Sequence, residues 1–374
     1  MSHGLKKALR IHIHCLLVFC LAPVPAYAGE ETPLNVALGE EAEREGESRL
    51  YRTRSERREA GLDREITPWL RFSGLAEFEA LGETFSAEDL DENITATEES
   101  AVIQLGLVAE PLEWLAGELI LEYDSEFDEV LVEEATVSAD VGDWEVLIGK
   151  QYLPFGVYYS NFITGPILDI GETQENAITL TWDHEDRLEF AASIYEGVAE
   201  QQDESGNGLD YALGLNAVVH ERLGIGVSYL ADLGDTDGRL LEDFDNRFAR
   251  KVAGLSAYAI WIGDSFESTV EVLGAQDHFN ELDSDRDRPL AWNFELALFI
   301  HPRAELDFRL EGSRQLAGFP ETQWGVATNI QLHRRAFLTL EVLRGDYKRG
   351  FELDDDDNAL KTVTTIGVQL ALAF

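Results

Sequence analysis

Apolar and polar residues alternate with a period of two along most of the chain from Pro68 onward. In the segment 290–300, "LAWNFELALFI", the large apolar residues occupy every second position, and Asn293 and Glu295 fall between them. Successive side chains of a β-strand point to opposite faces, so this pattern predicts strands. Charged residues fill the polar face of many of them, for instance Glu305 and Asp307 in "RAELDFRLEG". A dry protein core seldom tolerates so many charges, whereas the water-filled lumen of a membrane β-barrel does.

Sixteen segments show this alternation, and we predict that each forms one strand of an all-β, antiparallel, up-and-down transmembrane barrel. The predicted strands are 69–81, 100–110, 114–124, 129–140, 143–151, 176–184, 187–196, 209–219, 222–232, 250–262, 265–275, 290–300, 304–313, 323–333, 336–346 and 360–373.

The connections between these strands alternate in length, which supports the barrel. Short connections such as "PLE", "VGD", "ED", "ER", "GD", "HPR" and "RR" take turns with long, mostly acidic ones. The long connections are predicted at 82–99, 197–208, 233–249, 276–289 and 347–359. Outer-membrane barrels have short periplasmic turns and long extracellular loops, and an even strand number returns the C-terminus to the periplasm.

The chain ends in "TTIGVQLALAF", with Ile366, Val368, Leu370, Leu372 and Phe374 on one face. A last strand that ends in phenylalanine is similar to the signal read by the barrel-assembly machinery. We therefore expect this machinery to be a partner, acting through Phe374.

The N-terminus has the features of a secretory signal peptide. Lys6, Lys7 and Arg10 precede an apolar run at 11–24, and "AYAG" then offers small residues for cleavage after residue 28. We expect residues 1–28 to be removed, residues 29–66 to form a charged periplasmic segment that is helical or mobile, and residues 67–374 to form the barrel. These features predict the outer membrane of a Gram-negative bacterium as the location.

Composition narrows the chemistry of the mature protein. Both cysteines, Cys15 and Cys20, lie in the predicted signal peptide, so disulfides and thiol chemistry are excluded after cleavage. The chain has 72 acidic and 29 basic residues and a net charge of −43, which makes nucleic acid an improbable partner. Such charge fits either solubility in a salty habitat or a surface or pore that attracts cations.

No constellation of catalytic or metal-binding residues emerges from the sequence. The histidines after the signal fall at predicted turns or in a loop: His184, His220, His278, His301 and His333. The acid runs at 235–239 and 354–359 lack the glycine position of a calcium-binding EF-hand loop. We expect neither enzymatic activity nor a cofactor; loose divalent-cation bridges to lipopolysaccharide remain an alternative use of these acids.

Several carboxylates are predicted to face the lumen because they occupy the polar positions of the strands. They are Glu77, Glu79, Glu118, Glu122, Glu267, Glu271, Glu295, Glu305, Asp307, Glu311 and Glu341, with Arg71 and Arg309 opposing them. Any porin has a polar lumen, but this excess of acids favours cations or the cationic parts of a solute.

The connection 152–175 differs from all the others because it is aromatic and almost uncharged. It contains Tyr152, Phe155, Tyr158, Tyr159 and Phe162. An exposed loop of this kind would be an adhesive patch, whereas sixteen strands enclose a channel wide enough to admit it. We predict that this third extracellular loop folds inward and constricts the pore; a cap over the mouth or a contact between protomers are the alternatives.

Two charged residues frame this loop, Lys150 at its base and Glu172 near its return. Together with the five aromatic residues they are the candidate ligand path. The aromatic side chains would either contact the solute or pack against the wall, and packing is favoured.

The same stretch resembles the LbtU-like siderophore porin family, in which a Gly-Lys/Arg-x-Tyr-Leu-Pro-Phe-Gly element precedes a proline and then Gly-Glu-Thr. The matching residues are Gly149, Lys150, Tyr152, Leu153, Pro154, Phe155, Gly156, Pro166, Gly171, Glu172 and Thr173. The segment "FSGLAEFEA" is also similar to the first strand of that family. The resemblance implies an outer-membrane channel that takes up ferric siderophores and lacks a plug domain.

The sequence thus predicts a porin that passes a ferric siderophore or a similar small solute by diffusion through a constricted, acidic pore. A general cation-preferring porin and a surface-binding or adhesive barrel with acidic loops are the alternatives. A homo-oligomer is compatible with all three.

Overall fold

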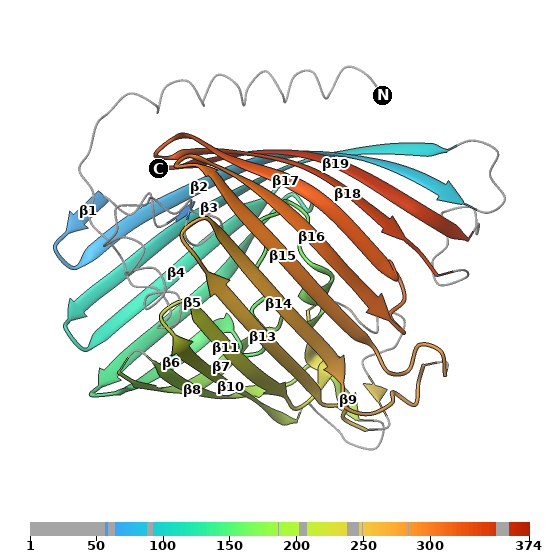
Figure 1. The fold of residues 1–374 in the computed structure, drawn as a ribbon. Helices are drawn as coiled ribbons and strands as arrows, with labels where there is room; N and C mark the ends of the chain where they lie inside the picture. The colour runs from blue at the N-terminus through green and yellow to red at the C-terminus, as the bar shows by residue number, and fades with distance from the viewer. Residues whose placement is uncertain are drawn as a thin grey trace.

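The computed structural model describes residues 57–58, 64–87, 93–185, 187–201, 208–237, 247–248, 250–282, 284–348 and 359–374. The predicted signal peptide and most of the charged segment therefore lie outside the described residues. The described part is dominated by one closed antiparallel β-barrel of sixteen strands, which tilt around a common axis (Figure 1). The predicted fold class is confirmed.

Each of the sixteen predicted strands corresponds to one strand of the wall. These are β2 (Leu70–Ala87), β3 (Ile94–Leu112), β4 (Leu115–Asp124), β5 (Glu129–Val141), β6 (Trp144–Tyr152), β7 (Gln174–His184), β8 (Leu188–Glu196), β10 (Leu209–His220), β11 (Leu223–Leu230), β13 (Gly254–Ile262), β14 (Phe266–Ala275), β15 (Leu290–His301), β16 (Ala304–Arg314), β17 (Thr322–His333), β18 (Ala336–Asp346) and β19 (Leu360–Ala373).

The remaining elements are short. β1 (Arg64–Thr67) pairs antiparallel with the start of β2, and β9 (Glu200–Gln201) pairs in parallel with β12 (Arg247–Phe248). Two 3₁₀ turns, η1 (Ile167–Gly171) and η2 (Leu233–Asp235), lie in connections at the long-loop end. No helix among the described residues is long and apolar enough to cross a membrane.

The barrel closes where β19 pairs with β2. The register runs from Leu360 opposite Ala87 to Ala373 opposite Leu75. Beyond the ladder, Phe374 and Gly74 exchange two backbone hydrogen bonds of 2.8 Å. The aromatic ring of Phe374 occupies the space that a Cβ at Gly74 would need, so the last residue of the chain packs on the first barrel strand.

One predicted loop is largely strand. The ladder between β2 and β3 continues to the pair Phe85–Ile94, so most of the connection predicted at 82–99 belongs to two long strands. Thr84, Thr95 and Thr97 occur in this extension, and β-branched residues favour extended backbone. This part of the ladder extends beyond the apolar band of the wall, so its sequence does not alternate between apolar and polar residues. The predicted ends of these two strands were wrong for this reason.

The wall has an apolar outer face and a polar inner face. In β15, Ala291, Asn293 and Glu295 are buried inside, whereas Leu290 and Phe294 on the other face are exposed. The same alternation recurs on β14 and β16. An outward apolar band is what a strand needs to contact lipid.

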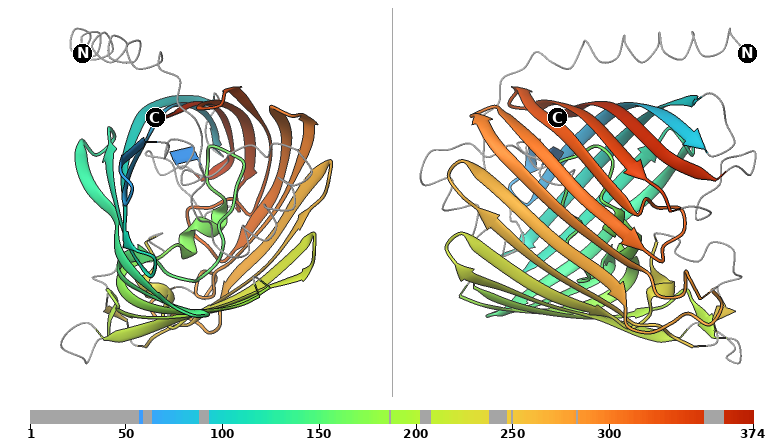
Figure 2. Two further views of the ribbon diagram at one scale, coloured as in Figure 1. Left: turned by 90° about the vertical axis from the view of Figure 1, so that its left-hand side faces the viewer. Right: turned by 45° about the vertical axis from the view of Figure 1, so that its right-hand side comes forward.

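The connection between β6 and β7 does not extend away from the barrel. It enters the lumen, and Figure 2 shows this green segment inside the ring of strands. Its backbone and side chains contact inward-facing residues of β11 and of β14 to β18. The prediction of an inward third loop is confirmed. We call residues 153–173 the constriction loop.

Candidate functional site

The constriction loop is fastened to the wall by carboxylates that accept hydrogen bonds from its backbone. The carboxylate of Glu271 accepts from the N–H of Val157 at 2.9 Å and of Tyr158 at 3.1 Å. Glu295 on β15 accepts from the N–H of Asn161 at 2.9 Å. An irregular loop has few backbone partners of its own, so these wall carboxylates satisfy donors that would otherwise need water.

The second half of the loop is held in the same way by β16 and β18. Glu341 accepts from the N–H of Ile163 at 2.7 Å, and from the N–H and hydroxyl of Thr164 at 3.2 and 2.6 Å. Glu311 accepts from the N–H of Ile167 at 2.7 Å, where η1 begins. The four carboxylates thus contact the loop from its first turn to its 3₁₀ turn.

Arg309 on β16 joins these carboxylates to the loop from beneath. Its guanidinium donates to Glu295 at 2.7 Å and to the carbonyl oxygens of Thr164 and Gly165 at 2.8 and 3.1 Å. It also contacts Ser160 and lies 4.3 Å from the ring centroid of Phe162. Because the Arg309 side chain is fully buried, its charge is balanced by these partners rather than by water.

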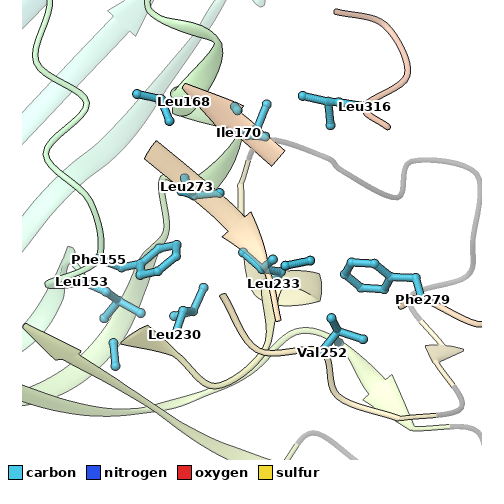
Figure 3. Close-up of a cluster of buried hydrophobic side chains, with 14 of the residues drawn as sticks. Leu153, Phe155, Leu168, Ile170, Leu230, Leu233, Val252, Leu273, Phe279 and Leu316 are labelled. Carbon is cyan, nitrogen blue, oxygen red and sulfur yellow. The ribbon is translucent and has the colours of Figure 1, made fainter. Parts of the chain in front are cut away.

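An apolar cluster secures the other side of the loop. Figure 3 shows Phe155, Leu168 and Ile170 of the loop facing Leu273 at the end of β14 and Leu233 of η2. Burying one such side chain stabilises a fold by about 1.5–3 kcal/mol. Polar bonds to the wall and apolar packing at the mouth therefore hold the loop in one place.

Gly149 sets the path by which β6 enters the loop. Its φ is +139°, and a Cβ there would lie 1.9 Å from the backbone oxygen of Ala135 on β5. An L-residue at this position is strained in its own backbone and also clashes with the neighbouring strand. This gives a physical reason for the glycine in the motif that starts at residue 149.

Gly149→Ala is expected to destabilise the folded barrel by more than about 1 kcal/mol, because alanine does not tolerate this backbone conformation. The urea midpoint of refolded barrel in detergent measures the effect. Gly117→Ala on β4 is the matched control, since its Cβ would make only an ordinary 3.5 Å contact with Thr136. Equal midpoints for the two variants would contradict the assigned role of Gly149.

The return of the loop is held by the segment 232–237 after β11. The N–H of Asp237 donates to the carbonyl of Glu172 at 2.9 Å, and the N–H of Gln174 donates to the Asp237 carboxylate. Behind this contact, Asp235 accepts from the hydroxyl of Tyr195 at 3.1 Å and from the N–H of Ala199 at 2.9 Å. The segment is therefore part of the framework that positions the loop.

Several acids crowd together behind this segment. Asp235, Asp232 and Asp210 are all buried, and Lys251 donates to Asp210 at 2.6 Å. The pKa of Asp235 is raised from 3.8 to about 7, mainly by burial; the hydrogen bond from Ala199 opposes the shift, and the neighbouring Asp232 and Asp210 add to it.

The stability of the barrel is expected to fall as pH rises from about 4 to about 7 and to level off above that, because the folded-state pKa of Asp235 lies above its unfolded value. Within this range the unfolded chain carries an ionised Asp235, whereas the folded barrel still holds the buried carboxyl protonated. Each unit of pKa difference corresponds to about 1.4 kcal/mol. Unfolding midpoints between pH 5 and pH 8.5 test this. Asp235→Asn should flatten the profile, and an unchanged profile would contradict it.

The residues predicted to form the ligand path have different environments. Phe155 and Phe162 are buried, Phe155 in the cluster of Figure 3 and Phe162 against Ala327 and Leu343. Tyr158 and Tyr159 are half-buried, and Tyr158 packs against the cluster.

The other three ligand-path residues lie at the two ends of the loop. Tyr152 is 41% exposed and donates its hydroxyl hydrogen to Glu133. Lys150 donates to the carbonyl of Val132 at 2.7 Å, and Glu172 is half-buried at the return of the loop. The phenylalanines therefore anchor the loop, and Tyr152 is the most accessible aromatic side chain of the set.

The predicted lumen acids also fall into groups. Glu271, Glu295, Glu311 and Glu341 hold the constriction loop, as described above. Glu267, Glu305 and Asp307 are buried on the same faces of β14 and β16. On the remaining wall, the amide group of Gln369 donates to Glu79 at 2.8 Å and that of Gln104 donates to Glu122 at 2.8 Å. Glu77 and Glu118 contact arginines.

Sequence reasoning missed the polar residues that complete the loop contacts. Ser228 on β11 accepts from the N–H of Gly156 at 2.9 Å, and Asn329 on β17 donates to the carbonyl of Asn161 at 2.8 Å. Small polar residues at inward positions are ordinary in a lumen. These two can be recognised as loop contacts only once the position of the loop is known. Within the described part of the chain, no group of three or more His, Asp or Glu residues is arranged to hold a metal ion.

Solved structures of similar architecture are outer-membrane proteins. The outer-membrane channel DcaP of Acinetobacter baumannii has a TM-score of 0.57 at 11% identity, covering 82% of this chain and 97% of that one. OprB of Pseudomonas putida has a TM-score of 0.58 at 10% identity, covering 82% and 94%. An anion-selective porin from Comamonas acidovorans has a TM-score of 0.58 at 10% identity, covering 82% and 99%.

Sequence comparison adds one relative. A UPF0422 protein of Coxiella burnetii is 26% identical over 280 residues, which cover 68% of this chain and 57% of that protein. The match thus spans little more than half of that relative. No protein-family model matches the chain. The chain has the fold of the outer-membrane porins.

Proposed function

We propose that this protein is a passive diffusion channel whose pore is narrowed by the constriction loop. The observation that carries the proposal is the loop itself, which lies inside a closed sixteen-strand barrel. It is tied there by the four carboxylates Glu271, Glu295, Glu311 and Glu341. A loop held at so many points defines a fixed constriction, and the size and charge of such a constriction select solutes. No bond is made or broken in this mechanism.

For the solute, we infer a ferric siderophore or a small complex of similar chemistry. The support is the resemblance of residues 149–173 to the LbtU-like siderophore porin family, which falls on the constriction loop.

A general cation-preferring porin is the second candidate, favoured by the 72 acidic residues of the chain. The structure supplies a counterargument, because the carboxylates nearest the loop are engaged by backbone N–H groups and by Arg309. Carboxylates that accept these hydrogen bonds still attract cations, but the N–H groups and the guanidinium partly cancel their electrostatic field.

Two measurements, one on the purified barrel and one in cells, separate these functions. Planar-bilayer recording under a KCl gradient gives conductance and ion preference, and uptake of labelled ferric siderophores by an iron-limited strain without its own receptors gives the solute. Conductance with saturable siderophore uptake supports the full proposal, and strong cation preference without uptake supports the general porin. A sealed lumen would contradict both and favour a surface-binding barrel.

A further inference from the structure

Two adjacent arginines from the N-terminal side of the barrel lie inside the lumen. Arg57 donates to the carboxylate of Glu77 on β2 at 3.2 Å, to the side-chain oxygen of Gln369 on β19, and to the hydroxyl of Thr339 on β18 at 3.5 Å. Only 6% of its surface is exposed. Arginine is almost never buried to this extent without partners, so the hydrogen bonds to the wall fix the Arg57 side chain in this position.

Arg58 contacts the neighbouring part of the wall. It donates to the side-chain oxygen of Gln104 on β3 at 3.1 Å and to Glu118 on β4 at 3.4 Å, and it is also 6% exposed. Its aliphatic stem lies over Gly106, where an added Cβ would be 3.2 Å from the Arg58 Cδ. The two side chains together contact five adjoining strands, β18, β19, β2, β3 and β4.

The arginines contact the part of the wall next to the one that holds the constriction loop, and the two parts share β18. Hydrogen bonds from the loop reach β11 and β14 to β18, whereas the arginines contact β18, β19, β2, β3 and β4. All of the arginine contacts lie in the half of the barrel nearer the short turns, since Thr339 and Glu118 are a few residues from such turns.

The constriction loop and the arginine pair are connected through two wall residues, Asn329 and Thr339. The Asn329 amide donates to the carbonyl of Asn161 in the loop at 2.8 Å, and it accepts from the hydroxyl of Thr339 at 2.6 Å. Arg57 in turn donates to that hydroxyl. A continuous hydrogen-bonded chain therefore connects the tip of the loop with the arginine pair.

We propose that Arg57 and Arg58 form a second constriction, which narrows the lumen beside the loop and lowers its preference for cations by covering Glu77 and Glu118. This inference rests on the proposed channel function. Without the arginines, the passage at this level would be wider and would present uncompensated carboxylates.

The test is bilayer recording of the full chain carrying Arg57→Gln and Arg58→Gln, which remove both charges and keep much of the side-chain length. We expect a severalfold rise in single-channel conductance and a shift of the reversal potential toward that of K⁺. The control is the double variant Arg222→Gln and Arg250→Gln. It changes the net charge equally but removes only the exposed pairs with Asp264 and Asp277, so both readouts should stay at the wild-type values.

A charge exchange keeps the test independent of folding defects. Arg57→Glu should open the channel, and adding Glu77→Arg should return conductance and selectivity toward wild type, with the heat-modifiable electrophoretic shift reporting a folded barrel throughout. Folded Arg57→Gln/Arg58→Gln channels with wild-type conductance and selectivity would overturn the inference and leave the proposed function standing. If neither wild type nor any variant conducts, the proposed function and this inference fail together. A sealed wild type with a conducting variant would contradict the proposed diffusion channel and support only the narrowing of the lumen by the arginines.

Discussion

Replacing Arg309 with methionine is expected to lower the free energy of unfolding by about 3–5 kcal/mol, the usual cost of removing one partner of a buried ion pair. Glu295 and Glu311 would keep their buried carboxylates but lose the guanidinium that neutralises them. The carbonyl oxygens of Thr164 and Gly165 would lose their donor as well. Denaturant unfolding of the refolded barrel in detergent measures the loss.

Two further variants make this measurement specific. Arg309→Lys keeps the charge but cannot reproduce the planar fork that reaches both carboxylates and the loop, so an intermediate loss is expected. Arg71→Met removes a more exposed pair with Glu110, for which about 0–1 kcal/mol is expected. If Arg309→Met costs no more than Arg71→Met, the buried network does not stabilise the barrel.

Replacing Glu341 with alanine is expected to release the tip of the constriction loop and raise single-channel conductance. The carboxylate is the acceptor for two backbone N–H groups and one hydroxyl of the loop. A buried donor left without an acceptor costs about 1–3 kcal/mol, part of which lumen water restores. Even a net loss of about 2 kcal/mol would change the ratio of docked to undocked loop by about 30-fold.

The matched control for this experiment is Glu83→Ala. Glu83 accepts a hydrogen bond from Thr365 in the wall and, among the described residues, makes no hydrogen bond to the loop. Its variant should conduct like the wild type. Limited proteolysis of the loop gives a second readout, because an undocked tip becomes accessible to protease. Unchanged conductance and unchanged protection in Glu341→Ala would show that the loop is held without this carboxylate.

The wall of the barrel was predictable because its physics is local. Each strand needs apolar residues toward lipid that alternate with polar residues toward water. The segment "LAWNFELALFI" shows this alternation within eleven residues. Turn and loop lengths are local as well, so their alternation supported the strand count. The extension of β2 and β3 to Phe85 and Ile94 was missed because it lies beyond the lipid-facing band, where outward residues need not be apolar.

The inward path of the constriction loop was predictable from composition, because an aromatic segment such as Phe155 to Phe162 avoids water. Its attachment was not. Glu271, Glu295, Glu311 and Glu341 look in the sequence like the acids of any polar lumen, and nothing local says that they accept bonds from a loop more than a hundred residues away.

The sequence by itself determined the strands of the wall, their number and the inward direction of the loop, since each depends on neighbours along the chain. Tertiary structure alone decided which charges meet. It placed Arg309 against the loop and Arg57 and Arg58 on the adjoining wall. It also brought carboxylates of the lumen into hydrogen bonds with backbone and guanidinium groups. The physical reason is that strand closure brings distant residues within hydrogen-bond distance, and electrostatic pairing at that distance depends on position in space rather than on sequence spacing.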